Sequence, residues 1–188
     1  MTDPGRDRAT INRQFQAVDC AFKAGDMASL RRALDDPPGF PNVLAPHDLG
    51  IDTLLEYAIY WSPVSFIREL IALGADVDYE DASGFPALIA AISTERADKL
   101  EVLRVLLEAG ANVAQRGIND WTPLHFAVSI RDLDSVRLLL AHGADPNART
   151  HIDECSTPLE DAETIGFTQA AISMRDNIAS TARQGTQQ

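Results

Sequence analysis

Cysteine is scarce in this sequence, because Cys20 and Cys155 are the only two among 188 residues. Two cysteines are too few for a disulfide framework and have no metal-ligand spacing, so we expect both to be free thiols. No apolar run approaches the roughly 20 residues of a membrane-spanning helix, and the first residues contain no apolar segment typical of a secretion signal. These absences favour a soluble, cytoplasmic protein without structural disulfides.

Positive charge is also scarce, because 16 lysines and arginines face 28 aspartates and glutamates and leave a net charge of −12. Binding to nucleic acid or to an anionic membrane depends on clustered cations, so the composition excludes both kinds of partner. A neutral or basic protein fits this charge better. The acidic excess lies in residues 37–150 and 151–188, where acidic residues outnumber basic ones by sixteen to eight and by six to two.

What the sequence does contain is a repeat. The segments "GADV", "GANV" and "GADP" begin at Gly74, Gly110 and Gly143, in steps of 36 and 33 residues. An apolar helical pattern precedes each glycine, and a shorter helical pattern precedes that one, in "DTLLEYAI", "FPALIAAI" and "WTPLHFAV". Each unit therefore predicts two helices and an extended excursion. Because one unit cannot bury its apolar face alone, the units must stack.

Local signals mark the ends of these helices. Thr122 is suited to accept hydrogen bonds from the first amides of a helix, and Pro123 fits the first helical position because its missing amide has no partner there. We interpret Ser62 and Pro63 as the same pair at the start of an outer helix. The three repeated glycines favour the left-handed backbone conformation that ends a helix.

These residues resemble the ankyrin repeat, whose pattern G-x-T-P-L-H-x-A-A is followed by an outer helix and by G-A-D-x-N. Residues 120–149 match this pattern nearly throughout, whereas 50–80 and 84–116 match it in part, the latter with a longer inter-helix turn near "STERADK". The resemblance implies an all-α ankyrin-repeat solenoid of stacked helix-turn-helix units with β-hairpin-like fingers.

The same resemblance suggests how the chain is organised. We expect one domain over residues 12–175, with end caps at about 12–36 and 156–175 that resemble ankyrin helix pairs. Residues 1–11 are expected to be flexible and residues 176–188 to form a tail. The segment 37–50 is dense in proline and glycine and is expected to form an irregular loop.

Motifs of catalysis are absent from the sequence. The four histidines, His47, His125, His142 and His151, have no catalytic or metal-binding spacing, and neither a phosphate-binding glycine loop nor a nucleophile motif occurs. We therefore expect no catalysis, no cofactor and no metal, with an enzyme or metal-binding protein as the least favoured alternative. The resemblance implies a structural hydrogen-bonding role for His125.

Ankyrin proteins typically bind partners through their finger tips and the concave face of the inner helices, and the resemblance points to the positions there that packing does not require. The predicted partner-binding residues are Asp52, Tyr60, Trp61, Phe85, Ile118, Asn119, Trp121 and Ile130. Exposed aromatic side chains supply contact area at small entropic cost. Tyr57 and Phe126 are assigned instead to the core, and the 37–50 loop is a candidate cover for Tyr60 and Trp61.

A second candidate surface is an acidic finger, formed by Asp76, Asp78, Glu80 and Asp81, which would meet a cationic partner or else be a solvated loop. The leading hypothesis for the whole chain is a protein-interaction module without catalysis. The alternative is an inhibitor or immunity-type protein that blocks a basic enzyme or toxin. The oligomeric state stays open, because exposed aromatic residues also suit a homodimer.

Overall fold

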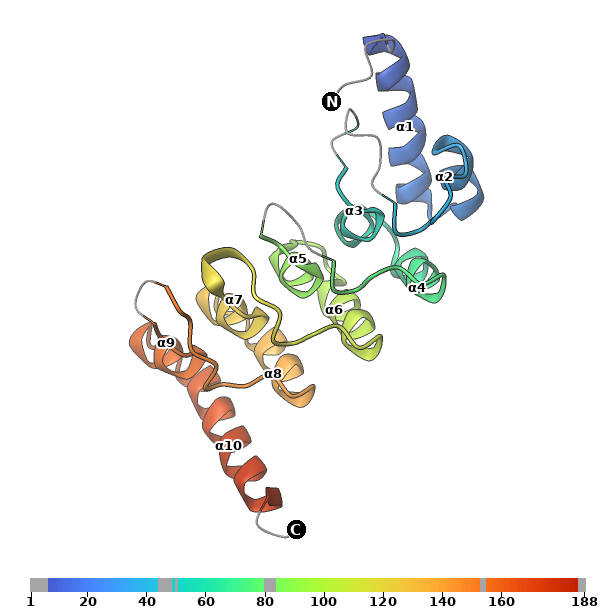
Figure 1. The fold of residues 1–188 in the computed structure, drawn as a ribbon. Helices are drawn as coiled ribbons and strands as arrows, with labels where there is room; N and C mark the ends of the chain where they lie inside the picture. Colours follow the sequence, from blue (N-terminus) through green and yellow to red (C-terminus); the bar gives the residue numbers. More distant parts are fainter. Residues whose placement is uncertain (1–6, 44–48, 50, 80–83, 153–154, 186–188) are drawn as a thin grey trace.

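The computed structural model describes residues 7–43, 49, 51–79, 84–152 and 155–185. These residues form ten α-helices and no β-strand, arranged as five pairs (Figure 1). The pairs are α1 (Arg8–Ala24) with α2 (Met27–Ala33), α3 (Leu54–Trp61) with α4 (Val64–Ala72), α5 (Ala87–Ser93) with α6 (Lys99–Glu108), α7 (Pro123–Ser129) with α8 (Leu133–Ala141), and α9 (Pro158–Thr164) with α10 (Thr168–Gly185). The predicted all-α repeat solenoid is confirmed.

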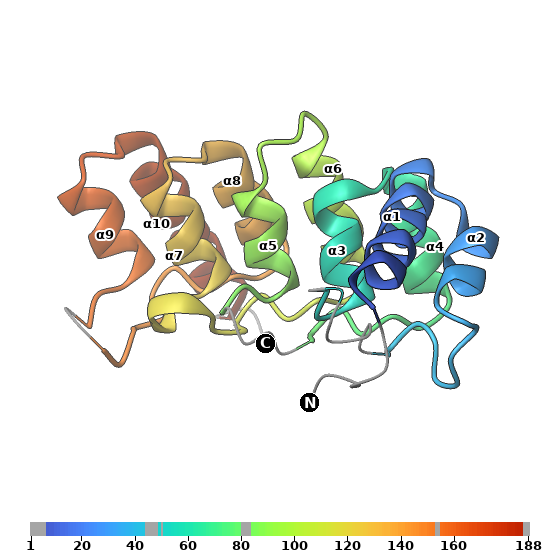
Figure 2. The same ribbon diagram turned by 90° about the horizontal axis from the view of Figure 1, so that it is seen from above.

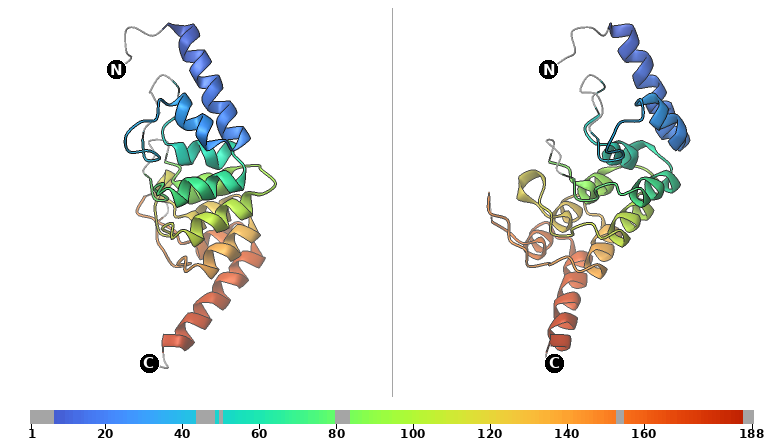
Figure 3. Two further views of the ribbon diagram at one scale, coloured as in Figure 1. Left: turned by 90° about the vertical axis from the view of Figure 1, so that its right-hand side faces the viewer. Right: turned by 45° about the vertical axis from the view of Figure 1, so that its right-hand side comes forward.

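The five pairs stack into two layers of helices. The first helices of the pairs, α1, α3, α5, α7 and α9, pack side by side as an inner layer, and α4, α6, α8 and α10 pack behind them as an outer layer (Figure 2). The segments that connect one pair to the next lie along one side of the stack. Figure 3 shows the pairs as successive tiers, with the long helices α1 and α10 extending away at opposite ends.

The core lies between the two layers and between successive tiers. Large side chains that are less than 2% exposed line it from the first tier to the fourth, among them Phe22, Phe66, Ile89, Leu106 and Leu124. Each fully buried side chain of this size contributes about 1.5–3 kcal/mol relative to an exposed one. Because every tier buries its apolar face against the next, the exposed surface of the inner helices is not needed for packing between tiers.

Threonine caps begin two of the inner helices, at Thr122 as predicted and at Thr157 in the same way. Thr122 and Thr157 each precede a proline in the first helical position, and each forms a capping box with the residue three positions later. The three repeated glycines that follow the outer helices have φ angles of 92°, 90° and 88°, which confirms the predicted left-handed conformation. These signals fix where each tier begins and ends.

One predicted cap is wrong. Helix α4 begins at Val64, and Pro63 occupies the N-cap position without a side-chain hydrogen bond. Ser62 instead follows the last turn of α3, and its hydroxyl is buried without a hydrogen-bond partner among the described residues. The reason is that both residues have extended backbone, with ψ angles of 157° and 149°, so the helix starts only after them.

The terminal helices extend past the expected domain limits of 12 and 175. Helix α1 begins at Arg8, because the Asp7 carboxylate accepts a hydrogen bond from the Thr10 amide at 2.7 Å and caps the helix there. Helix α10 continues to Gly185 as a single helix. None of the helices in the described part of the chain combines the length and the hydropathy that crossing a membrane requires.

Candidate functional site

The predicted partner-binding residues lie at two separate places along the inner layer. Asp52, Trp61, Ile118, Asn119 and Ile130 are exposed, and Tyr60, Phe85 and Trp121 are half-buried. Tyr60 and Trp61 end α3, whereas Trp121 and Ile130 flank α7, two tiers further along. The structure therefore divides the predicted surface into an N-terminal part and a C-terminal part.

The N-terminal part is built around Trp61, the most exposed aromatic residue in the described chain at 55%. Its ring lies 6.5 Å from the Tyr57 ring, and the Lys23 ammonium lies 5.5 Å from its centroid. The Asp19 carboxylate accepts hydrogen bonds from the Tyr57 hydroxyl at 2.8 Å and from Lys23 at 2.9 Å. We call Asp19, Phe22, Lys23, Tyr57 and Trp61 the N-terminal cluster. Its carboxylate, ammonium and phenol groups are paired with one another.

Electrostatics agree with this pairing. The hydrogen bond from Lys23 lowers the pKa of Asp19 below its ordinary value. Burial and the hydrogen bond donated to Asp19 raise the pKa of Tyr57. Tyr57 also packs on Phe22, with 4.9 Å between ring centroids, at the edge of the core rather than fully inside it. Sequence reasoning missed Asp19 and Lys23 because they come from the preceding tier.

Phe126 joins Phe85 and Trp121 into one aromatic group. Its ring centroid lies 6.0 Å from that of Phe85 and 6.5 Å from that of Trp121, both in edge-to-face geometry. Such pairs contribute about 0.5–1.5 kcal/mol beyond the area they bury. Phe85 is therefore held by packing, whereas the far side of Trp121 opens onto a cavity.

That cavity, which we call the C-terminal pocket, has a volume of about 410 Å³ and lies between α7 and α9. Its size falls in the range of about 300–1,000 Å³ that is common for binding pockets. The lining residues are Trp121, Val128, Ser129, Thr150, Ile152, Ser156, Asp161, Thr164 and Ile165. Of these, only Trp121 is among the predicted partner-binding residues, because most of the others come from segments that meet only in the folded chain.

His125 supports one wall of the C-terminal pocket and is 1% exposed. Its Nδ1 accepts a hydrogen bond from the Thr122 amide at 3.2 Å, and its Nε2 donates to the carbonyl oxygen of Ser156 at 3.3 Å. Burial lowers the pKa of the imidazole below its ordinary value of 6.5, which favours the neutral form. The structural hydrogen-bonding role expected for His125 is confirmed.

The acidic finger is only partly within the described residues, since Glu80 and Asp81 lie outside them. The Asp76 carboxylate accepts from the Asp78 amide at 2.9 Å, and the Asp78 carboxylate accepts from the Asn112 amide of the next finger at 2.7 Å. The Asp78 carboxylate thus connects adjacent fingers through a main-chain amide, whereas the Asp76 carboxylate binds an amide of its own finger. Within the described ranges no three His, Cys, Asp or Glu side chains gather as a metal site.

The 37–50 loop was a candidate cover for Tyr60 and Trp61, and its residues 44–48 and 50 lie outside the described part. In the described part, the Asn42 side chain donates to the Gly74 carbonyl oxygen at 2.7 Å and accepts from the Asp76 amide at 2.7 Å. This stretch therefore lies against the finger after α4. The Tyr60 hydroxyl is 3.3 Å from that of Ser93 in the next tier.

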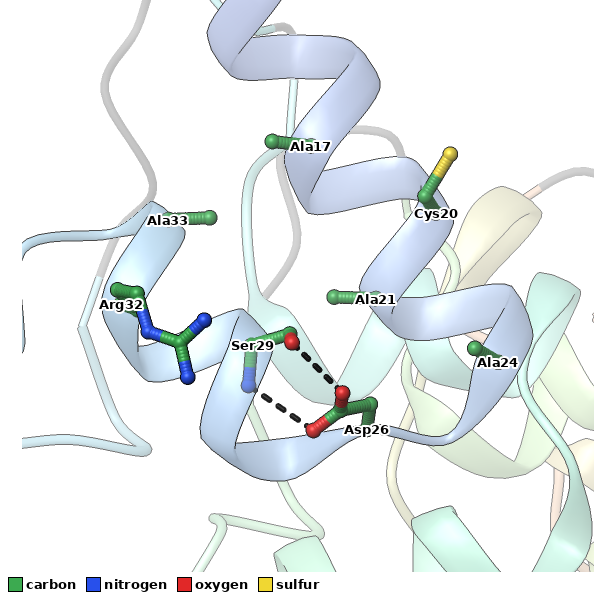
Figure 4. Close-up of a pocket in the computed structure, with 8 residues that line it drawn as sticks. All are labelled: Ala17, Cys20, Ala21, Ala24, Asp26, Ser29, Arg32 and Ala33. Carbon is green, nitrogen blue, oxygen red and sulfur yellow. Dashed lines mark hydrogen bonds between the residues drawn. The ribbon is translucent and has the colours of Figure 1, made fainter.

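A further hollow of about 430 Å³ lies between α1 and α2 (Figure 4). Alanines form half of its eight lining residues, and Cys20 stands at its edge. Asp26 is committed to capping α2, because its carboxylate accepts from both the amide and the hydroxyl of Ser29. This hollow has no aromatic wall, and its carboxylate and hydroxyl are paired with each other, unlike those of the C-terminal pocket.

Comparison with known proteins fits this architecture. A family model of ankyrin repeats, in three copies, matches residues 55–150. The chain belongs to the ankyrin-repeat family. The first and last helix pairs lie beyond the matched range and complete the stack of this ankyrin-repeat chain at its two ends.

The relatives of the chain share its repeats. It is 34% identical over 133 residues to a proposed ankyrin repeat protein of Rickettsia felis, covering 66% of this chain and 57% of that protein. It is 37% identical over 115 residues to a proposed E3 ubiquitin-protein ligase of Arabidopsis thaliana, covering 60% of this chain and 24% of the ligase. It is 36% identical over 114 residues to palmitoyltransferase Hip14 of Drosophila melanogaster, covering 60% of this chain and 17% of the transferase. Ankyrin repeats are protein-interaction modules, and the chain spans only a minor part of these two enzymes.

Proposed function

We propose that the chain binds a partner protein through the C-terminal part of its inner surface, with Trp121 as the central contact, and that it performs no catalysis. The observation that carries this proposal is the C-terminal pocket beside the Trp121 ring. A half-buried indole at the wall of an open pocket is the arrangement in which aromatic side chains dominate binding energy. Exposed Ile118, Ile130 and Ile152 add apolar contact area near the same tier.

The test compares Trp121→Ala with Trp61→Ala, since each removes one indole from the inner surface. Tagged wild-type and variant chains are used to capture proteins from a lysate of the native organism at low and high salt. The affinity of the captured protein is then measured by calorimetry. Trp121→Ala should weaken binding by about 2 kcal/mol or more, roughly 30-fold, and Trp61→Ala by less.

Folding is the control for this experiment, because Trp121 also packs on Phe126. The thermal unfolding curve of each variant should show a cooperative transition above the temperature of the binding assay. If Trp121→Ala binds the same protein with wild-type affinity, the proposed site is wrong. If Trp61→Ala is the more damaging change, the binding surface lies on the N-terminal cluster.

The net charge of −12 favours an inhibitory form of this function, in which the chain blocks a basic enzyme or toxin. Complementary charge speeds association and makes it sensitive to salt. Such a captured enzyme should lose activity in proportion to the chain added, and Trp121→Ala should need about 30-fold more protein for the same inhibition. An enzyme that keeps full activity in the complex would indicate scaffolding instead.

A further inference from the structure

The C-terminal pocket occupies a place that an aromatic ring fills one tier earlier. Phe85, just before α5, packs edge-on against Phe126 of α7, with 6.0 Å between centroids. Trp121 holds the corresponding position before α7, and Asp161 holds in α9 the position that Phe126 holds in α7. A short carboxylate therefore stands where a second ring would close against Trp121, and the pocket is the space that remains.

Three of the four hydroxyl groups that line this pocket, those of Ser129, Thr150 and Thr164, present oxygen lone pairs rather than hydrogens. The Ser129 and Thr164 hydroxyls each donate at 2.8 Å to a main-chain carbonyl oxygen one turn earlier in their own helix. The Thr150 hydroxyl donates to two main-chain carbonyl oxygens, each at 3.4 Å. Because each hydroxyl has a single hydrogen, only its lone pairs are left for a bound group. The pocket is therefore rich in acceptors.

The strongest acceptor in the pocket is Asp161, which is half-buried and forms no hydrogen bond or ion pair through its carboxylate within the described part of the chain. By contrast, Glu160 and Glu163 on the same helix pair with Arg149 and Arg175, at 2.9 and 2.6 Å. A carboxylate that loses water without gaining a donor is costly, so a bound donor at this position would be favoured.

One cation of the chain lies at the edge of this pocket. Arg131, in the turn after α7, donates from its guanidinium to the carbonyl oxygen of Ile165, where α9 ends. It thereby satisfies the end of the helix and forms no ion pair with Asp161. The segment that supplies Asp161 is acidic overall, since residues 151–188 contain six acidic and two basic residues.

We propose that the C-terminal pocket binds a lysine or arginine side chain of the partner protein, an inference that rests on the proposed function. The aliphatic stem lies against Trp121 and Ile152, and the cationic group reaches the Asp161 carboxylate and the neighbouring hydroxyl oxygens. An indole face attracts a cation, a long basic side chain buries its methylene groups on apolar surface, and a carboxylate pairs with its charge. No other common side chain satisfies all three parts of the pocket.

Nuclear magnetic resonance can test this with a small probe, because the chain has two tryptophans and hence two indole N–H signals. Trp61→Phe assigns the Trp121 signal. The probes are acetyl-Gly-Arg-Gly-amide and the same peptide with citrulline, which has nearly the shape of arginine without its charge. The arginine peptide should move the Trp121 signal saturably, with an affinity at least about tenfold higher than that of the citrulline peptide.

Two variants of the carboxylate sharpen the result. Asp161→Asn should weaken binding of the arginine peptide about tenfold, while Asp134→Asn should leave it unchanged. Asp134 is a matched control because it also lies in the first turn of a helix, on the exposed face of α8. Asp161→Phe should abolish the saturable shift while the chain stays folded, since it places a ring where Phe126 stands one tier earlier.

The outcomes separate this inference from the proposed function. Equal affinity for the arginine and citrulline peptides, unchanged binding by Asp161→Asn, or no shift of the Trp121 signal with either peptide overturns the cationic pocket. If Trp121→Ala still loses the partner protein in that case, the proposed function stands and the pocket takes an uncharged anchor. If Trp121→Ala keeps the partner as well, both proposals are wrong.

Discussion

The two tryptophans of the inner surface stand in opposite situations. Trp61 is the more exposed, yet its neighbours are paired with one another: Lys23 lies over its ring, and the Asp19 carboxylate receives both Lys23 and Tyr57. Trp121 is half-buried, but it faces an open pocket in which Asp161 has no donor among the described residues. The N-terminal cluster pairs its charged groups internally, whereas the C-terminal pocket leaves its carboxylate available to a partner.

The difference shows that exposure alone is a poor guide to a binding site. An exposed ring whose polar neighbours are already hydrogen-bonded provides contact area, but it does not select a partner of particular shape or charge. A pocket that combines an aromatic wall with an unpaired carboxylate specifies both the shape and the charge of its ligand. The contrast between the two sites depends on two sets of contacts: those that pair the groups of the N-terminal cluster and those that shape the C-terminal pocket. Variants that remove contacts of either set should therefore test it.

The largest effect is expected at Arg96, which holds the end of α3 and hence the position of Trp61. Its guanidinium donates to the carbonyl oxygens of Ile59 and Ser62, each at 2.7 Å, and its side chain is only 15% exposed. Arg96→Ala leaves two partly buried carbonyl groups without a charged donor and should lower the free energy of unfolding by about 3 kcal/mol. Urea denaturation followed by circular dichroism measures this change.

The control for that change is Arg104→Ala, because Arg104 is 47% exposed and, among the described residues, pairs only with Glu101 on the surface of α6. Exposed ion pairs contribute about 0–1 kcal/mol, so this variant should stay within about 0.5 kcal/mol of the wild type. If Arg96→Ala loses no more stability than Arg104→Ala, the end of α3 does not depend on the hydrogen bonds that Arg96 donates.

The next effect concerns His125, whose hydrogen bonds hold the wall of the C-terminal pocket. His125→Ala should lower the free energy of unfolding by about 2 kcal/mol at pH 7.5, because it removes two buried hydrogen bonds and leaves a small cavity. The pKa of His125 is lowered in the folded chain, so the unfolded chain binds its proton more readily. The stabilisation from His125 is therefore complete above pH 6.5 and decreases as the pH falls through its folded value.

Denaturation of the wild type and His125→Ala between pH 7.5 and 5 should accordingly show a difference that shrinks toward acid. His142→Ala is the matched control, since His142 is exposed at the end of α8. That variant should differ from the wild type by less than about 0.5 kcal/mol throughout. A difference for His125→Ala that is constant with pH, or that grows toward acid, would contradict the neutral, buried imidazole.

The sequence predicted the tiers well because their signals are local. The glycines at 74, 110 and 143, and the caps at Thr122 and Thr157, act within one turn of backbone and carry the same meaning wherever they occur. The Ser62 cap failed because its type fits a cap while the extended backbone of Pro63 delays the helix. Periodicity cannot detect that delay.

The candidate site could be predicted only in part, because it depends on contacts across tiers. Trp121 was visible as an aromatic residue at a variable position, but Asp161 falls on the unspecified position of the ankyrin pattern just before Ala162 and carries no family signal. A comparison of corresponding positions would have found it: this position is tyrosine in α3, alanine in α5, phenylalanine in α7 and aspartate in α9. That a carboxylate there opens a pocket follows only from the packing of α9 against α7.

The smallest effect should come from Tyr57→Phe, which partly opens the closed N-terminal cluster. The change removes the hydroxyl that donates to Asp19 at 2.8 Å but keeps the ring packed on Phe22. Asp19 retains Lys23 and the bond is only partly buried, so the free energy of unfolding should fall by about 1 kcal/mol, below the roughly 1.5–3 kcal/mol of a hydrogen bond to a charged group. Tyr60→Phe is the matched control, because the hydroxyls of Tyr60 and Ser93 are both uncharged and 3.3 Å apart.

Tyr60→Phe should therefore cost less than about 0.5 kcal/mol, and urea denaturation at pH 7 compares the two variants directly. These two variants test the contrast between the N-terminal cluster and the C-terminal pocket. Tyr57→Phe leaves the Asp19 carboxylate with one donor fewer and so makes it more like the Asp161 carboxylate, which has none among the described residues. If both variants lose the same stability, the Asp19 hydrogen bond does not distinguish the N-terminal cluster. The two tryptophans would then differ by the pocket alone.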